Sequence, residues 1–335
     1  MSYHYAIEKV KALSKNTIFI INAGGWFVGN SAVLEWLDGF PEVSFIPGDF
    51  DILREEGGLF DLIISTTERS DVDNAFKEIK YFLWRKLFKL VKFRVADYTK
   101  YLFTTHRYSY KNHDRQFAFY YRLFRKVAYF EKNHQNIDIY GYWRDWIVEE
   151  ARLFNPNKEL KYVLLQNPFY YRSFAPHHEV VWKELFVNRK VIFVCRNHLD
   201  QYKTIKDAGQ LIHTKHTPFR KGTETLNEKD RFFCLNTKLY ESRIEFVQDR
   251  HEEIMLVNFE DFVRELKSKD LISFLGLNKN TNIYFDFNYS RKNVGISQQD
   301  QNAQDFYREN LIRFAELEGL KNKLNQEYDN RVLFN

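Results

Sequence analysis

The stretch TIFIINAGGWFVGNS, residues 17–31, decides the fold class. Its first half is an uninterrupted run of mostly apolar residues, which is typical of a strand buried in a parallel sheet. The glycines that follow predict a tight turn, and a helix is expected to begin near Ser31. The first turn of a helix presents unpaired backbone N–H groups, so we expect this junction to bind a phosphate-like anion.

A second stretch, KVIFVCRNHLD at residues 190–200, repeats the pattern of an apolar strand that runs into a helix. Here Arg196 stands at the junction, and Thr204 follows eight residues later. Two such junctions predict a ligand with phosphate-like groups at both ends, which is a property of nucleotides that carry more than one phosphate cluster.

The first junction is close to the phosphate loop G-x-x-x-x-G-K-[ST] of enzymes that split nucleoside triphosphates. Residues 24–31 match that loop everywhere except at Asn30, which stands where the loop carries lysine. Because this lysine binds the β- and γ-phosphates, its absence argues against triphosphate hydrolysis. A small-molecule kinase stays an alternative function, and it would need another loop cation and an acid that binds Mg²⁺.

The second junction resembles the 3′-phosphate motif of sulfotransferases that use 3′-phosphoadenosine 5′-phosphosulfate. That family has an arginine at a strand end and a Ser or Thr eight residues later, as Arg196 and Thr204 do here. Asn197 and Asp200 also stand at the family's spacings, whereas His198 replaces its usual proline.

Other segments are similar to the same family in the same order. They are the turn at 24–31 (its 5′-phosphosulfate loop), 259–261 (its Tyr-Glu-Asp), 274–277 (its Phe-Leu-Gly) and 291–295 (its late Arg-Lys-Gly). The resemblance covers residues 16–50 and 160–297. It implies one sulfotransferase-like α/β domain over residues 1–335, with a parallel β-sheet flanked by helices.

The resemblance also implies which residues hold the donor nucleotide. The 5′-phosphosulfate would be held by Gly24, Gly25, Trp26, Phe27, Val28, Gly29, Asn30 and Ser31. The 3′-phosphate would be held by Arg196, Thr204, Arg291, Lys292 and Asn293. The product would be adenosine 3′,5′-bisphosphate, and the transfer needs no metal.

Two departures from the family concern positive charge. Phe27 stands where the family usually has Lys or Arg, and its Lys-x-Pro is altered to Gln-Asn-Pro at 166–168. Another cation is therefore expected at the site, and Arg107, Arg172 and Lys203 are the candidates. A non-catalytic, glycan-binding relative that keeps the nucleotide frame is the second alternative function.

Transfer to a hydroxyl also needs a general base. Asp49 follows an expected strand at 43–46, at the place where several relatives carry a glutamate base, and Asp51 is the fallback. A turn cap is the competing interpretation of Asp49. His106 is a further candidate base, as is the pair at 177–178.

The middle of the chain predicts an inserted helical layer over residues 70–155. Aromatic residues make up 18% of the chain, and many of them fall here with almost no Pro or Gly. Helical spacing predicts helices over 73–90, 116–130 and 142–154. In this fold such insertions generally cover the acceptor, and we expect a hydroxyl of a surface glycan or of its lipid-linked precursor.

Basic and aromatic residues alternate over 81–94, and three interpretations stay open. The segment is an amphipathic helix with aromatic residues inward and lysines outward, a peripheral contact to a membrane, or a glycan groove with stacking rings.

Composition limits the remaining classes. The net charge of +5 does not require nucleic acid, and two cysteines in an apolar context predict reduced core residues. No run approaches the roughly 18 apolar residues of a membrane span, and the N-terminus lacks a signal-peptide pattern. We expect a cytoplasmic protein, peripheral to the inner membrane at most.

The remaining elements complete a βα alternation. Strands are expected at 17–22, 43–46, 161–166, 190–195 and 254–258, helices near 231–247 and 303–324, and irregular chain over 278–300. Ligands of such sheets bind at the carboxyl ends of the strands.

Overall fold

The computed structural model describes most of the chain. It covers residues 14–23, 28–49, 51–54, 56–101, 108–166, 176–207, 226–248, 254–266, 268–279, 281, 283 and 285–332.

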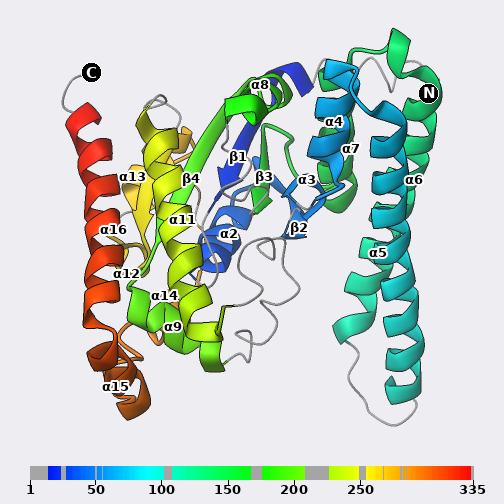
Figure 1. The fold of residues 1–335 in the computed structure, drawn as a ribbon. Coiled ribbons are helices and arrows are strands. Elements are labelled where there is room, and N and C mark those ends of the chain that lie inside the picture. The colour runs from blue at the N-terminus through cyan, green and yellow to red at the C-terminus, as the bar shows by residue number, and fades with distance from the viewer. Residues whose placement is uncertain are drawn as a thin grey trace.

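A five-stranded, all-parallel sheet forms the centre of the molecule (Figure 1). Its strands are β1 (Ile18–Asn22), β2 (Val43–Asp49), β3 (Tyr162–Gln166), β4 (Arg189–Cys195) and β5 (Ile254–Asn258). The order across the sheet is β2-β3-β1-β4-β5, so β1 lies in the middle with β3 and β4 as its neighbours. The predicted fold class and all five predicted strands are confirmed.

Alternate residues of the strands face two separate hydrophobic cores, as the twofold period of a strand requires. Ile20, Leu164 and Ile192 face one core, which is covered by α2 (Asn30–Asp38), α12 (Phe259–Val263) and α13 (Ser268–Leu275). Phe19 and Ile21 face the other and larger core.

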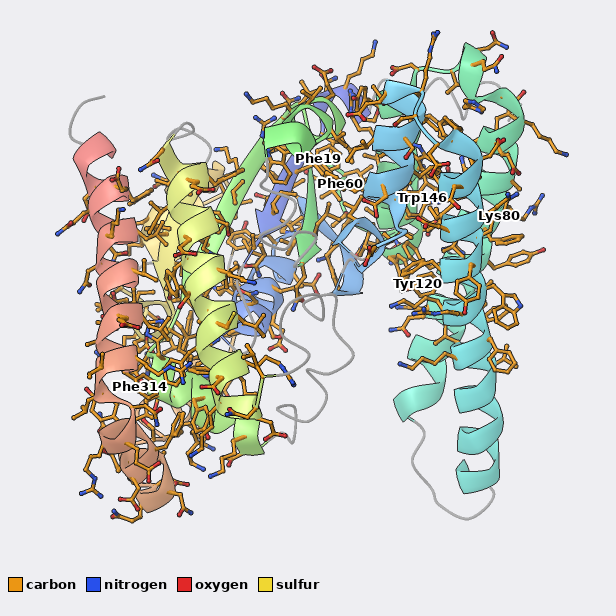
Figure 2. All side chains as sticks on the ribbon, in the orientation of Figure 1. Phe19, Phe60, Lys80, Tyr120, Trp146 and Phe314 are labelled. Carbon is orange, nitrogen blue, oxygen red and sulfur yellow. The ribbon has the colours of Figure 1, made fainter. Side chains whose placement is uncertain are left out.

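The larger core lies under several helices. They are α4 (Leu59–Glu68), α7 (Ile139–Phe154), α8 (Pro176–Leu185), α11 (Glu228–Gln248) and α16 (Leu311–Val332), with α3 (Asp51–Arg54) beside them. Figure 2 shows Phe19 of β1, Phe60 of α4 and Trp146 of α7 gathered between the sheet and its helices. These side chains are buried, so α4 and α7 are attached to the sheet by hydrophobic packing.

The inserted layer consists of α5 (Val72–Tyr101), α6 (Tyr108–Asn133), a short 3₁₀ turn (His134–Asn136) and α7. The three helices predicted over 70–155 are therefore confirmed, although α5 and α6 are longer than predicted. Helices α5 and α6 form an antiparallel hairpin beyond α4 and α7, on the opposite flank of the molecule from α11 and α16 (Figure 1). That this layer covers the acceptor stays a prediction.

The predicted C-terminal elements need two corrections. The single helix expected over 303–324 is two helices, α15 (Gln301–Glu309) and α16, separated at Asn310. The segment 278–300 contains a short helix, α14 (Phe287–Arg291), although it was expected to be irregular throughout. Helix α15 has its own cap at Asp300, whose side chain accepts from the Ala303 N–H, and therefore starts independently.

Candidate functional site

The end of β1 and the start of α2 form the first half of the site. Gly29 is the residue before α2 and has φ +97°, a left-handed conformation that a glycine adopts without strain. A Cβ at this position would overlap the ring of Phe259, so the backbone of the turn lies directly against that ring. Gly29 has no side chain with which to cap this helix, and the first turn contains no acidic residue. The start of α2 is therefore electropositive.

Two buried side chains fix the ends of this turn. The Asn22 side-chain amide donates to the Asn30 carbonyl oxygen at 2.9 Å, which links the last residue of β1 to the first residue of α2. Arg243 of α11 donates from Nη2 to the Ala23 carbonyl oxygen at 2.8 Å. The turn is thus held at both ends by hydrogen bonds before any ligand binds.

Arg243 is an unusual residue at this place because its side chain is 1% exposed. Its guanidinium lies 5.0 Å from the centre of the Phe193 ring, and its Nη1 is 3.9 Å from Cys195 Sγ. Within the described part of the chain no carboxylate pairs with it, and Nε has no hydrogen-bond partner. A buried charge without a counter-ion is costly, so this position favours a nearby anion.

Arg196 forms the second half of the site, one residue after β4. It is buried, its guanidinium carbon lies 5.1 Å from the centre of the Phe259 ring, and Nη2 donates to the Asn293 carbonyl oxygen. Burial lowers the pKa of the Arg196 guanidinium, and the nearby carboxylates of Asp200 and Glu260 oppose this shift.

The two halves lie next to each other. Strands β1 and β4 are paired, and both Gly29 and Arg196 contact the ring of Phe259. The loop glycine and the arginine therefore follow neighbouring strands of the sheet.

The start of α9 (His198–Asp207) differs from the expectation of a second open helix end. The Asn197 side chain accepts from the N–H groups of Leu199 and Asp200, at 3.0 and 3.1 Å. Glu260 Oε1 accepts from the Asn197 N–H at 2.9 Å. These N–H groups are already satisfied, so the prediction of an anion at this end rests on the Arg196 guanidinium.

Asp200 attaches a later segment of the chain to α9. Its carboxylate accepts from the N–H groups of Gly295 and Ser297 at 2.6 and 2.9 Å, and from the Ser297 hydroxyl at 2.6 Å. This fastening holds Asn293 beside Arg196. Thr204, the predicted phosphate ligand, donates its hydroxyl to the Asp200 carbonyl oxygen at 2.8 Å.

Arg291 and Lys292 differ in their surroundings. The Arg291 guanidinium pairs with Glu265 at 2.8 Å and donates from Nε to the Val263 carbonyl oxygen at 2.7 Å. Lys292 is exposed. Their role at the 3′-phosphate stays a prediction, and Arg291 would have to leave Glu265 to take part.

The candidate base Asp49 is the last residue of β2, one strand beyond β3 from the central strand. The strand was expected to end at residue 46, but it continues through a register irregularity between Phe45 and Asp49. Asp49 pairs in register with Gln166, which pairs in turn with Asn22. The Asp49 backbone therefore lies two strand spacings, about 10 Å, from the end of β1. Its role as a base stays a prediction.

Several predicted positions cannot be placed in the same detail. Gly24, Gly25, Trp26, Phe27, His106, Arg107 and Arg172 lie outside the described residues. Asp51 begins α3, and residues 177 and 178 lie in the first turn of α8. Lys203, the third cation considered for the site, pairs with Asp207 at 2.7 Å and Asp300 at 2.8 Å, which neutralise its charge.

Sequence reasoning missed Arg243 and Asn22. The signal for Arg243 was available, because Tyr240, Ile244 and Val247 predict the buried face of α11 and Arg243 falls on that face. An arginine at such a position needs a reason. Asn22 ends a buried strand with a side chain that is 0% exposed, which carries the same signal.

Among the described residues, no three or more His, Cys, Asp or Glu side chains gather in a way that could hold a metal ion. Cys195 and Cys234 are both unpaired thiols, as predicted. Cys195 is buried and Cys234 is partly buried.

No family model and no curated protein match this chain. Among solved structures, it is similar to the sulfotransferase domain of the olefin synthase of Synechococcus PCC 7002. The two share 15% sequence identity with a TM-score of 0.41, over 79% of this chain and 74% of that chain. This neighbour is of the class that the motifs resemble. At that TM-score the similarity carries no argument about the site, which rests on the contacts above.

Proposed function

We propose that this protein is a sulfotransferase that moves a sulfuryl group from 3′-phosphoadenosine 5′-phosphosulfate to a hydroxyl group. The observation that carries the proposal is the contact of Gly29 and Arg196 with the same Phe259 ring. It supports one compact, doubly anionic ligand with one anionic group at each residue. A triphosphate has its charges in a single chain and would place them all at one of these two positions.

The 5′ end of the donor fits the open start of α2. A phosphosulfate there would accept hydrogen bonds from backbone N–H groups around residues 28–31. It would also lie at the positive end of the helix dipole. Arg243 lies behind this turn through its bond to Ala23 and supplies the positive charge that Phe27 does not. Its contribution would be electrostatic, because its side chain is buried and does not reach solvent.

The 3′-phosphate fits Arg196. A phosphate is a stronger acceptor than the Asn293 carbonyl that Arg196 now contacts, and its charge would offset the burial cost of the guanidinium. Asp200 would keep the segment 293–297 folded over this end of the nucleotide.

The donor supplies the sulfuryl group and its leaving phosphate, and the protein supplies position and charge. The start of α2 and Arg243 would stabilise negative charge that builds up on the leaving oxygen. Asp49, at the same edge of the sheet, would accept the proton of the acceptor hydroxyl. The acceptor would be a glycan hydroxyl bound on the side of the sheet that carries β2, below the inserted helices.

Calorimetric titration with adenosine 3′,5′-bisphosphate tests the proposal. Arg196→Ala should weaken binding about 10- to 100-fold, since a hydrogen bond to a charged group contributes about 1.5–3 kcal/mol. The same variant should bind adenosine 5′-monophosphate like the wild type, because that nucleotide has no 3′-phosphate. Arg152→Ala, an exposed arginine of α7, is the matched control.

Equal affinity of Arg196→Ala and wild type for the bisphosphate would refute the assignment of the 3′-phosphate. If ATP raises the melting temperature of the protein more than the bisphosphate does, the kinase alternative would be favoured. Binding of the bisphosphate without transfer of labelled sulfate to any glycan extract would favour the non-catalytic relative.

A further inference from the structure

Helix α5 exposes a continuous stripe of large apolar side chains. Tyr81, Trp84, Phe88 and Val91 are 60%, 56%, 57% and 45% exposed. Their spacing of three, four and three residues places them on one side of the helix. The rings follow one another closely, with centres 6.3 Å apart between Tyr81 and Trp84 and 5.4 Å apart between Trp84 and Phe88.

This stripe is not the face with which α5 packs on the protein. The packing face consists of Phe76, Ile79, Phe82 and Leu83, all of them buried. The interpretation of 81–94 with its aromatic residues inward is therefore wrong for Tyr81, Trp84 and Phe88. A helix that is apolar on two opposite sides has a second partner surface to cover.

Between Glu78 and Asp97 all charged residues of α5 are positive. From Ile79 to Ala96 the sequence contains four lysines and two arginines and no Asp or Glu. Lys80 pairs with Glu131 of α6 at 2.5 Å, so its charge is balanced within the hairpin of α5 and α6. Arg85 is exposed beside the stripe, with its guanidinium carbon 5.6 Å from the centre of the Tyr81 ring. The surface thus combines apolar rings with cations.

The same segment is poor in groups that bind sugars by hydrogen bonds. Between Ile79 and Ala96 there is no Asn, Gln, Ser, Thr or His, in addition to the absence of acids. Sugar hydroxyl groups need such donors and acceptors, whereas lipid phosphates need cations and acyl chains need apolar side chains. The composition therefore favours a lipid surface over a glycan.

We propose that α5 lies flat on an anionic lipid bilayer, with Trp84 and Phe88 at the boundary between headgroups and acyl chains. Arg85 and Lys89, one helical turn apart on the same flank of the stripe, then contact lipid phosphates. This is a peripheral contact, since no helix among the described residues is long and apolar enough to cross a bilayer. The inference does not depend on the nucleotide site.

Vesicle co-sedimentation of the full chain tests the proposal. Wild type should sediment with vesicles of phosphatidylglycerol and phosphatidylcholine, and much less with phosphatidylcholine alone. The partition coefficient of the double variant Trp84→Ser, Phe88→Ser between vesicles and buffer should be about tenfold lower or more, because two large rings no longer enter the membrane interface. Ile312→Ser, a 77% exposed apolar residue of α16, is the matched control and should bind like the wild type.

Two further measurements keep the outcome decisive. Arg85→Gln, Lys89→Gln should weaken binding to the anionic vesicles and reduce its dependence on salt. Trp84 fluorescence should shift to the blue on vesicle addition in wild type, and this shift should be missing in Trp84→Phe, which still binds. Equal sedimentation of wild type and the variant Trp84→Ser, Phe88→Ser would overturn the proposal. Equal binding of the wild type to both vesicle types, or no binding to either, would also overturn it. If the wild type is a dimer in solution and the variant Trp84→Ser, Phe88→Ser is a monomer, the stripe would instead contact a second copy of the chain.

Discussion

The starts of α2 and α9 look alike in sequence and differ in structure. Both follow buried, neighbouring strands of the parallel sheet. The start of α2 has a glycine as its cap residue and no acid in its first turn. The start of α9 is closed by Asn197 and Glu260, which take up its N–H groups.

The two helix starts therefore offer an anion different groups. At α2 the backbone itself is available to an anion, and the buried charge of Arg243 stands behind it. At α9 the backbone is satisfied, and the only charged donor turned toward the shared Phe259 ring is Arg196 among the described residues. A strand–helix junction offers its backbone to an anion only where its N–H groups have no other acceptor.

The largest effect is expected from Gly29→Ala. Left-handed backbone costs a non-glycine residue roughly 1–2 kcal/mol, and overlap with the Phe259 ring adds about 1–3 kcal/mol. The free energy of unfolding, measured in urea, should fall by the sum of the two. Gly319→Ala in α16, where a Cβ meets nothing within 4 Å, should instead stabilise by about 0.5–1 kcal/mol. A neutral Gly29→Ala would show that the turn does not press on Phe259.

The second effect concerns the charge behind α2. Arg243→Met should weaken binding of adenosine 5′-monophosphate about tenfold, because a charge behind the turn contributes on the order of 1–2 kcal/mol at an effective dielectric constant of about 20. Arg243→Lys keeps the charge and should recover most of the affinity. Calorimetry at two salt concentrations checks this. Equal losses in both variants would mean that Arg243 only shapes the turn.

A smaller effect is expected at the capped end. Asn197→Ala should lower the free energy of unfolding by about 1 kcal/mol, the usual cost of losing a helix cap. Asn157→Ala in an exposed turn is the control. Affinity for the bisphosphate should stay within about twofold, because the account assigns no backbone contact to α9. A large loss of affinity would mean that the capped N–H groups bind phosphate after all.

The smallest effect is a pH dependence at the buried first residue of α9. Burial lowers the pKa of His198, and its hydrogen bond to Glu318 lowers the pKa of that carboxyl to about 2. The unfolded chain therefore binds protons more readily at both groups, and the free energy of unfolding decreases as the pH is lowered. The His198 step begins below about pH 6.5, and the Glu318 step runs from about pH 4.5 toward pH 2.

The variant Glu318→Gln isolates the second of these steps. It should melt below the wild type at pH 7 by an amount equivalent to about 1 kcal/mol or less, since Glu318 is partly exposed. The two melting temperatures should converge as the pH falls from 4.5 toward 2. Glu316→Gln, an exposed neighbour, should match the wild type throughout, and a constant gap for Glu318→Gln would contradict the pKa assignment.

The sequence predicts the sheet well because each strand is a buried apolar run, and such runs need no knowledge of distant residues. It fails where the partner is distant in the chain. Glu260 closes α9 from 63 positions away, and Arg243 reaches Ala23 from 220 positions away. Pro47 and Gly48 read as the end of β2, yet pairing with β3 carries the strand through to Asp49. For Trp84 and Phe88 the sequence leaves three interpretations open, because the alternation of rings and cations does not show which side of the helix packs on the protein.

The most direct test of the account is a crystal structure with adenosine 3′,5′-bisphosphate bound. The account predicts the 5′-phosphate on the backbone at residues 28–31, at the open start of α2, and the 3′-phosphate on the guanidinium of Arg196. A nucleotide bound with its 5′-phosphate at α9, or at a place that touches neither Gly29 nor Arg196, would contradict it.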